Sequence, residues 1–206
     1  MSATRPFNPF RSDRLVYRAV NNTPDDENFV YTIQSDAEAQ SGSSYGLLRP
    51  ESIKSSNEFK QHVAEKCLLG AIICLPSISS DAGGVDEAGE PVGIICLKSN
   101  PPHHAHHRWT DLSIDIVRYY RGKGYGGEAI LWAQWYAFQM AGLHRVQISA
   151  FSFNTGALKL YKRLGFKEEG RQRHFMWFNG GWHDHVLFGI LEDEWREIQR
   201  QAGKQM

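Results

Sequence analysis

Cysteine is scarce in this chain, and its cysteines do not form a recognisable pattern. The 206 residues include only 3, Cys67, Cys74 and Cys96, an odd number without C-x-x-C spacing. A disulfide framework or a cysteine-based zinc site needs paired or closely spaced cysteines. We therefore expect buried free thiols in a reducing compartment.

Long hydrophobic runs and a net charge are missing as well. No apolar run approaches membrane-spanning length, and residues 1–10 hold no apolar stretch long enough for a signal peptide. Acidic and basic residues balance at 23 each, so no overall field favours nucleic acid or an anionic membrane. We expect a cytoplasmic protein, with nuclear access left open. We also expect a single domain over residues 1–206, with a flexible tail at 1–12.

The hydrophobic pattern predicts an α/β fold. Apolar, β-branched runs and amphipathic or apolar helical runs follow one another, separated by stretches rich in Ser, Gly and Asp. Exposed loops are expected at 40–50 and 76–90. Strands are expected at 14–20, 67–75, 91–97, 109–117, 145–150, 166–178 and 182–191, and helices at 23–39, 55–66, 124–141 and 154–164.

A glycine-rich loop between a strand and a long helix is typical of an anion-binding site. Its glycines allow backbone N–H groups to point at one spot, and the helix start adds unpaired N–H groups and a positive dipole end. Two basic side chains add formal charge, so a phosphate or pyrophosphate is the expected ligand. The loop consists of Arg121, Gly122, Lys123, Gly124, Tyr125, Gly126 and Gly127.

Two other phosphate-binding motifs are excluded, one by its context and one by its absence. Gly122, Gly124 and Gly127 fit the G-x-G-x-x-G spacing of a dinucleotide fold, but such a fold needs an acidic residue roughly 20 positions further on. No Asp or Glu occurs from Ala129 through Lys167. The G-x-x-x-x-G-K-[ST] pattern of the nucleotide-binding P-loop is also absent.

A second motif, after the strand at 145–150, gives the loop a more specific interpretation. Together the two segments resemble the GNAT superfamily of acetyl-CoA-dependent N-acetyltransferases. In that family an R/Q-x-x-G-x-G/A loop holds the coenzyme A pyrophosphate, and an N-x-x-A-x-x-L-Y-x-x-x-G-F segment lies against the pantetheine arm. The residues that match are Arg121, Gly124 and Gly126 for the first motif, and Asn154, Ala157, Leu160, Tyr161, Gly165 and Phe166 for the second.

The resemblance implies a fold and a cosubstrate. The expected fold is a GNAT-like mixed, mainly antiparallel twisted sheet flanked by helices, with acetyl-CoA as cosubstrate and no metal. The strand before the loop would splay from its neighbour and give backbone hydrogen bonds to pantetheine, at Ile114, Asp115 and Ile116. The run Gly170-Arg171-x-Arg173, then Gly181-x-x-Asp184, resembles the branch that acetylates ribosomal-protein N-termini, spermidine and other small amines.

Acetyl transfer to an amine needs a proton for the departing thiolate and a base for the ammonium. Tyr161 stands where the family commonly carries a tyrosine that protonates the sulfur, although a tyrosine on a helix can equally pack its ring into the core. Asn154 can cap the following helix as well as contact pantetheine.

The base is less clear from the residues. Where many relatives carry a glutamate, five residues before the asparagine, this chain has Ser149. Asp111 and Asp115 lie on one face of the preceding strand and are candidates for deprotonating the amine through a water. The alternative is that both belong to a solvated strand face.

Clustered histidines follow Pro101-Pro102, but a metal site is not favoured. Adjacent histidines on a proline-led loop rarely converge on one tetrahedral point, so a solvated loop is the better interpretation, with one histidine kept as a further candidate base. They are His103, His104, His106 and His107.

The sequence thus favours an enzyme that moves acetyl from acetyl-CoA to a primary amine, such as a protein N-terminus or a polyamine, by direct attack in a ternary complex. The alternative is an acyl-CoA-binding sensor or scaffold without turnover. No nucleic-acid or membrane partner is expected, and a homodimer is left open.

Overall fold

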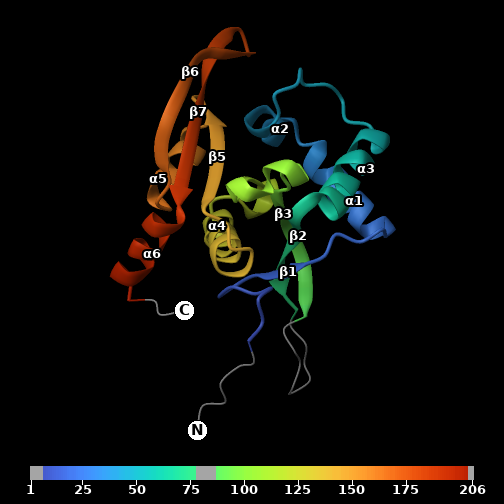
Figure 1. The fold of residues 1–206 in the computed structure, drawn as a ribbon. Coiled ribbons are helices and arrows are strands. Elements are labelled where there is room, and N and C mark those ends of the chain that lie inside the picture. The colour runs from blue at the N-terminus through green and yellow to red at the C-terminus, as the bar shows by residue number, and fades with distance from the viewer. Residues whose placement is uncertain (1–6, 78–86, 204–206) are drawn as a thin grey trace.

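A seven-stranded sheet organises the part of the chain that the structure describes. The computed structural model describes residues 7–77 and 87–203. The strand order is β1-β2-β3-β4-β5-β7-β6, and every neighbouring pair is antiparallel except β4 and β5. This confirms the predicted mixed, mainly antiparallel sheet (Figure 1). The strands are β1 Val16–Arg18, β2 Cys67–Pro76, β3 Ala88–Lys98, β4 Trp109–Ile116, β5 Arg145–Phe151, β6 Lys167–Phe178 and β7 Gly181–Leu191.

Helices cover both faces of the β2–β4 part of the sheet. On one face α4 packs against β3, β4 and β5, and on the other α1 and α3 cover β2 and β3. Because both faces are covered, β2 and β3 read as continuous apolar runs rather than alternating ones. The helices are α1 Pro24–Gln34, α2 Ala37–Ser43, α3 Ile53–Gln61, α4 Tyr125–Trp135, α5 Thr155–Arg163 and α6 Glu192–Gln201, with π-helical turns at His62–Lys66 and Tyr136–Met140.

The helix expected at 23–39 is in fact two helices. It begins as predicted, with Thr23 accepting a hydrogen bond from the Asp26 N–H, but α1 ends at Gln34. The carboxylate of Asp36 then accepts from the N–H groups of Glu38 and Ala39, which starts α2. An aspartate at an N-cap stabilises a new helix start, so the chain turns here instead of continuing. Part of the loop expected at 40–50 is therefore helical, as far as Ser43.

Both ends of the described chain differ from the expectation. Helix α6 was missed, although its first turn is acidic and Trp195 on its inner face is 2% exposed. Residues 7–12, expected to belong to a flexible tail, contact α4. There the Trp132 indole N–H donates to the Pro9 carbonyl at 2.8 Å, and Ser12 Oγ donates to Glu128 at 2.7 Å. The first strand is shorter than 14–20. It pairs with β2, and its Val16 also forms an isolated bridge with Arg11.

The cysteines are free, as expected, but they are not all buried. Cys74 and Cys96 are buried, whereas Cys67 at the start of β2 is partly exposed. The loop expected at 76–90 lies mostly outside the described residues, and β3 begins at Ala88. Among the residues described, no helix has the length and apolar character to cross a membrane.

Gly165 should be more sensitive to substitution than another glycine of the same backbone conformation. Gly165 has φ +90° and an added Cβ would lie 2.5 Å from Ile198 Cδ1 on α6, whereas Gly180 has φ +81° and nothing within 4 Å. Left-handed strain costs about 1–2 kcal/mol at either site, and overpacking adds about 1–3 kcal/mol at Gly165. Urea unfolding should therefore show a clearly larger loss for Gly165→Ala than for Gly180→Ala. Equal losses would mean that α6 does not pack tightly there.

Candidate active site

A cleft opens where two neighbouring parallel strands separate. Strands β4 and β5 pair only from Trp109 opposite Arg145 to Asp111 opposite Gln147. Beyond these three pairs β4 continues along β3, and β5 continues along β7. The cleft has a volume of about 1070 Å³ and is walled by β4, β5, the 121–127 loop, α2 and α5. The structure therefore shows the splay that the resemblance implied.

All predicted site residues line this one cleft. They come from strand β4, from the loop that begins α4, and from α5 with its cap. Their roles stay predictions, but segments separated by many residues in the sequence converge as expected. The residues are Asp111, Ile114, Asp115, Ile116, Arg121, Gly122, Lys123, Gly124, Tyr125, Gly126, Gly127, Asn154 and Tyr161.

The glycine-rich loop has the backbone conformation that anion binding requires. Gly122 and Gly124 have φ of +75° and +86°, which other residues rarely adopt. Gly124 is the N-cap of α4, and no side chain caps this helix. The first N–H groups of α4 and its positive dipole end are thus presented at the cleft. Arg14 is close by, because its Nη1 donates to the Lys123 carbonyl at 3.1 Å.

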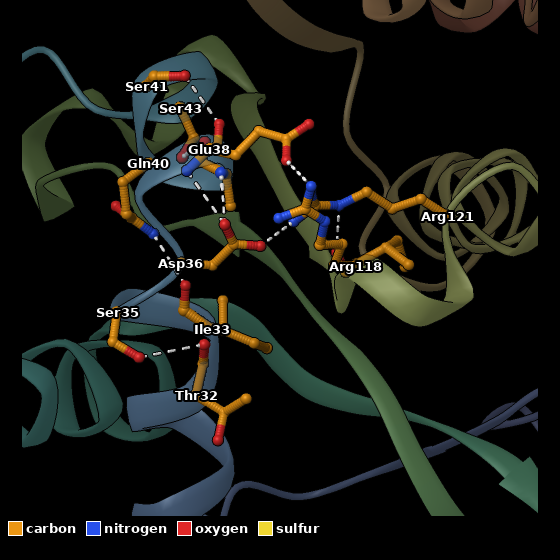
Figure 2. A network of polar contacts seen from close by, with 12 residues as sticks. Thr32, Ile33, Ser35, Asp36, Glu38, Gln40, Ser41, Ser43, Arg118 and Arg121 are labelled. Atoms are coloured by element: carbon orange, nitrogen blue, oxygen red, sulfur yellow. Dashed lines mark hydrogen bonds and ion pairs between the residues drawn. The ribbon is translucent and has the colours of Figure 1, made fainter.

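Two ion pairs tie α2 and its cap to this loop and to the 3₁₀ turn Arg118–Tyr120 before it. Arg121 Nη2 lies 2.7 Å from Asp36 Oδ2, and Arg118 Nη2 lies 3.1 Å from Glu38 Oε2. Figure 2 shows Asp36 placed between the first turn of α2 and Arg121. Arg121 Nε also donates to the Ile116 carbonyl at 2.8 Å, which fixes the side chain at the end of β4. The guanidinium is therefore held at the cleft by the carboxylate of Asp36.

The two candidate bases are in different environments. Gln147 Nε2 donates to Asp111 Oδ1 at 2.7 Å, where the strands are still paired. Asp115 lies deeper under α2. Burial raises its pKa to about 6, with Asp36 adding to the effect while Arg121 and a hydrogen bond from Ser43 oppose it.

Tyr161 packs in the core and also faces the cleft. Its side chain is 8% exposed and packs on Phe166 and Phe188, yet it also lines the cleft. Burial, followed by the nearby charge of Asp115, raises its pKa well above the usual range, so the phenol keeps its proton.

Asn154 caps α5 as expected, since its Oδ1 accepts from the Ala157 N–H at 3.1 Å. Asn154 also touches α2, because an added Cβ on Gly42 would lie 2.9 Å from its Nδ2.

Two cleft residues were missed by the sequence reasoning. Tyr45, in the loop after α2, and His185, on β7, line the end of the cleft near Phe151 and Phe153. They belong to no sequence motif. They are far apart in the sequence, and the register of the sheet brings them together.

By contrast, His103, His104, His106 and His107 form an exposed 3₁₀ turn and do not line the cleft. Among the described residues no group of three or more His, Cys, Asp or Glu could hold a metal ion.

The family assignment follows from comparison with known proteins. The pattern of the acetyltransferase (GNAT) family matches residues 57–166, which covers more than half of the chain and both motifs. The chain belongs to the GNAT family of acetyltransferases. The GNAT match ends at Phe166, so β6, β7 and α6 lie beyond it.

Similar proteins act on different amines. The chain is 31% identical over 84 residues to the [ribosomal protein uS5]-alanine N-acetyltransferase of Escherichia coli, covering 41% of this chain and 43% of that one. It is 27% identical over 116 residues to the spermidine N(1)-acetyltransferase of the same species, covering 56% and 61%. The matches thus span less than two thirds of these relatives.

The fold is also that of solved GNAT structures. The spermidine N-acetyltransferase from Vibrio cholerae, in complex with CoA and spermine, superposes with a TM-score of 0.69 at 23% identity, covering 90% of this chain and 99% of that one. The superposition extends well beyond the segment that the family pattern matches, and at this identity it supports the fold alone.

Asp115 and Asp36 should give opposite pH dependences of stability. The pKa of Asp115 is raised to about 6, so the folded state holds its proton while the unfolded chain loses it, and stability falls as pH rises from about 4 to about 6. Partial burial alone would raise the pKa of Asp36, but hydrogen bonds from Ala39 N–H and Arg121 outweigh it and lower that pKa. The contribution of Asp36 is thus present above about pH 4 and lost below it.

Two substitutions measure this difference. Asp115→Asn should gain stability relative to the parent at pH 7.5, by up to about 3 kcal/mol for a shift of about two pKa units, and should gain little at pH 4. Asp36→Asn should instead be less stable than the parent at pH 7.5, with the difference shrinking towards pH 3. Urea unfolding of both variants across this range provides the measurement. A pH-independent effect of Asp115→Asn would contradict the assignment of a buried carboxyl.

Proposed function

We propose that this protein transfers the acetyl group of acetyl-CoA to a primary amine by direct attack in a ternary complex. The observation that carries the proposal is the cleft itself. It joins an anion-binding loop at one end to an aromatic end lined by Tyr45 and Phe151, with Tyr161 on its wall. The relatives named above act on a ribosomal protein's alanine and on spermidine, so a protein N-terminus, a polyamine or another small amine is the proposed acceptor class.

The residues of the loop fit the pyrophosphate of the cosubstrate. Bound there, the phosphates would receive N–H groups from the start of α4 and charge from Arg121 and Lys123. Arg121 would exchange Asp36 for phosphate oxygens. The free backbone edges of Ile114, Asp115 and Ile116, which β5 does not pair, would hold the pantetheine arm. This arrangement directs the thioester into the gap between β4 and β5.

The chemistry requires little beyond positioning. The thioester supplies the activated acetyl group, and the chain must hold it against a neutral amine. Tyr161, kept protonated by burial, donates its proton towards the sulfur as the thiolate departs. Asp111 and Asp115, whose pKa is raised to about 6, are the acidic groups on β4 that could take the amine's proton.

An acetyl-transfer assay with a panel of amines tests the function. Acetyl-CoA would be offered with peptides bearing free N-termini, with polyamines and with simple alkylamines, and thiol release and acetylated product would both be measured. Amine-dependent release of thiol supports the proposal. Coenzyme A binding without turnover on any amine would instead support an acyl-CoA-binding sensor or scaffold.

Gly124→Val should weaken coenzyme A binding. A valine at φ +86° strains the loop and adds atoms where backbone and phosphate must meet, and even a Cβ would lie 3.2 Å from Arg14 Nη2. Calorimetry should show a loss of more than about tenfold, or about 1.4 kcal/mol. Gly142→Val is the matched control, because Gly142 has φ +61° and nothing within 4 Å, outside the cleft. Equal affinities for both variants would remove the loop from the binding site.

Tyr161→Phe should lower turnover without lowering affinity. The substitution keeps the ring and its packing on Phe166 and Phe188 but deletes the proton donor. We expect kcat to fall by about 10² to 10⁴ while the acetyl-CoA dissociation constant changes little. Tyr136→Phe, which changes a helix tyrosine outside the cleft, serves as the control. Parental turnover in Tyr161→Phe would leave this side chain a packing role only.

A further inference from the structure

A hydrogen-bonded chain of side chains leads from the wall of the cleft into the β6–β7 hairpin. Tyr45 Oη lies 3.4 Å from Ser149 Oγ and 3.0 Å from His185 Nε2. On the far side of the imidazole, His185 Nδ1 lies 3.0 Å from Gln172 Oε1. Tyr45, Ser149 and His185 all line the cleft. None of these four residues belongs to the anion-binding loop or to the motif that contains Tyr161.

The proton positions in this chain follow from the orientation assigned to the Gln172 amide. Because Gln172 presents its carbonyl oxygen, Nδ1 of His185 carries the ring proton and donates it to Gln172. Nε2 then has a free lone pair, and Tyr45 donates its hydroxyl proton to it. His185 is therefore arranged to accept a proton that arrives through Tyr45.

The strand register holds His185 in place. On β7 it lies opposite Phe151 of β5 on one side and opposite Gln172 of β6 on the other. Its side chain is 7% exposed, and burial lowers its pKa, so the imidazole is neutral at pH 7. The ring centroids of Phe175 and Phe151 lie 4.9 and 5.7 Å from that of His185, where aromatic faces help to stabilise a cation.

Within the described part of the chain, the hydrogen-bond and ring partners of this imidazole are all uncharged side chains. The loop after α2 contributes Tyr45, β5 contributes Phe151, and β6 contributes Gln172 and Phe175. On β7 itself, Asp184 points to the other face and pairs with Arg171 at 3.2 Å. His183, two residues away, turns to the Phe178 carbonyl instead. The charge state of His185 therefore depends on its burial and on the proton that Tyr45 delivers.

The two carboxylates suggested by the sequence are less suited to this role. Asp111 already accepts a hydrogen bond from Gln147 at the closed end of the splay. Asp115 lies under α2 beside Ser43 and Arg121, which is the end proposed for coenzyme binding. Tyr45 is 59% exposed and packs against Phe151 and Phe175, where an acceptor amine can reach it.

We infer that Tyr45 and His185 form the proton relay that deprotonates the acceptor amine, an inference that rests on the proposed function. The ammonium gives one proton to Tyr45 Oη as Tyr45 gives its own to His185 Nε2. The freed nitrogen lone pair forms the bond to the thioester carbonyl carbon, and the C–S bond breaks. The sulfur takes a proton from Tyr161, which recovers one from the new amide nitrogen. The imidazolium returns its proton to solvent through Tyr45, so the net products are amide, thiol and one proton.

The test compares His185→Gln and Tyr45→Phe with His183→Gln, a β7 histidine whose side chain lies outside the cleft. The substrate is the best acceptor of the amine panel. In the parent and in His183→Gln, kcat/KM should rise with pH through an ionisation below 6.5, the ordinary histidine pKa. In His185→Gln and Tyr45→Phe this rise should disappear, and kcat/KM should instead increase in proportion to the fraction of neutral amine. At pH 7 the kcat/KM of these two variants should be lower than the parent's by about 10², with coenzyme A affinity unchanged.

A second acceptor separates proton transfer from packing. With a fluorinated alkylamine that is already neutral at pH 7, the relay variants should reach rates close to the parent's, because no proton has to be removed before attack. An unchanged pH profile in both variants, or equal losses with the neutral and the protonated amine, would overturn the relay while leaving the acetyltransferase function intact. A parent that acetylates no amine would overturn the proposed function and the relay together.

Discussion

Three pairs of residues between β4 and β5 determine the position of every group in the cleft. Parallel strands normally stay paired along their length, but here each strand leaves for an antiparallel partner after Asp111 and Gln147. On its other edge β4 is held closely to β3, because a Cβ on Gly93 would lie 2.6 Å from the Asp115 carbonyl. The cleft that opens between the two strands is lined by the loop that starts α4 and by α5, and it follows from this one divergence.

Burial tunes the chemistry of the cleft more than ion pairing does. Asp115, Tyr161 and His185 each have a pKa moved towards the neutral form, and in each case burial is the main cause. Acetyl transfer needs such neutral forms, since a protonated phenol and an unprotonated imidazole can give and take protons near pH 7. The charged groups are instead at the coenzyme end, where Arg121 meets Asp36.

Local motifs and hydrophobic pattern predicted the sheet and the presence of the glycine-rich loop and Tyr161 in one cleft, because these depend on short stretches of sequence. The break at Asp36 was missed because a polar run without strong periodicity is compatible with one continuous helix or with two. Only the capping of a new helix by Asp36 distinguishes the two. The start of α6 was also missed, although the acidic residues 192–194 are a local signal for it. Tyr45 and His185 had no such signal. Their contact depends on the register of β5, β7 and β6 and on the path of the loop after α2, and neither can be read from the neighbouring residues.

The pairing of Asp36 with Arg121 makes helix α2 and the anion site compete for one guanidinium (Figure 2). Asp36 also caps α2, and Tyr45 follows that helix after only one more residue, Ser44. An anion that takes Arg121 releases the carboxylate from its ion pair, and a change that loosens α2 leaves Arg121 freer for the anion. Thermodynamic linkage makes these two effects equal in free energy. Under the proposed function, binding of the coenzyme's phosphates at Arg121 is therefore coupled to the order of α2 and of the segment that carries Tyr45.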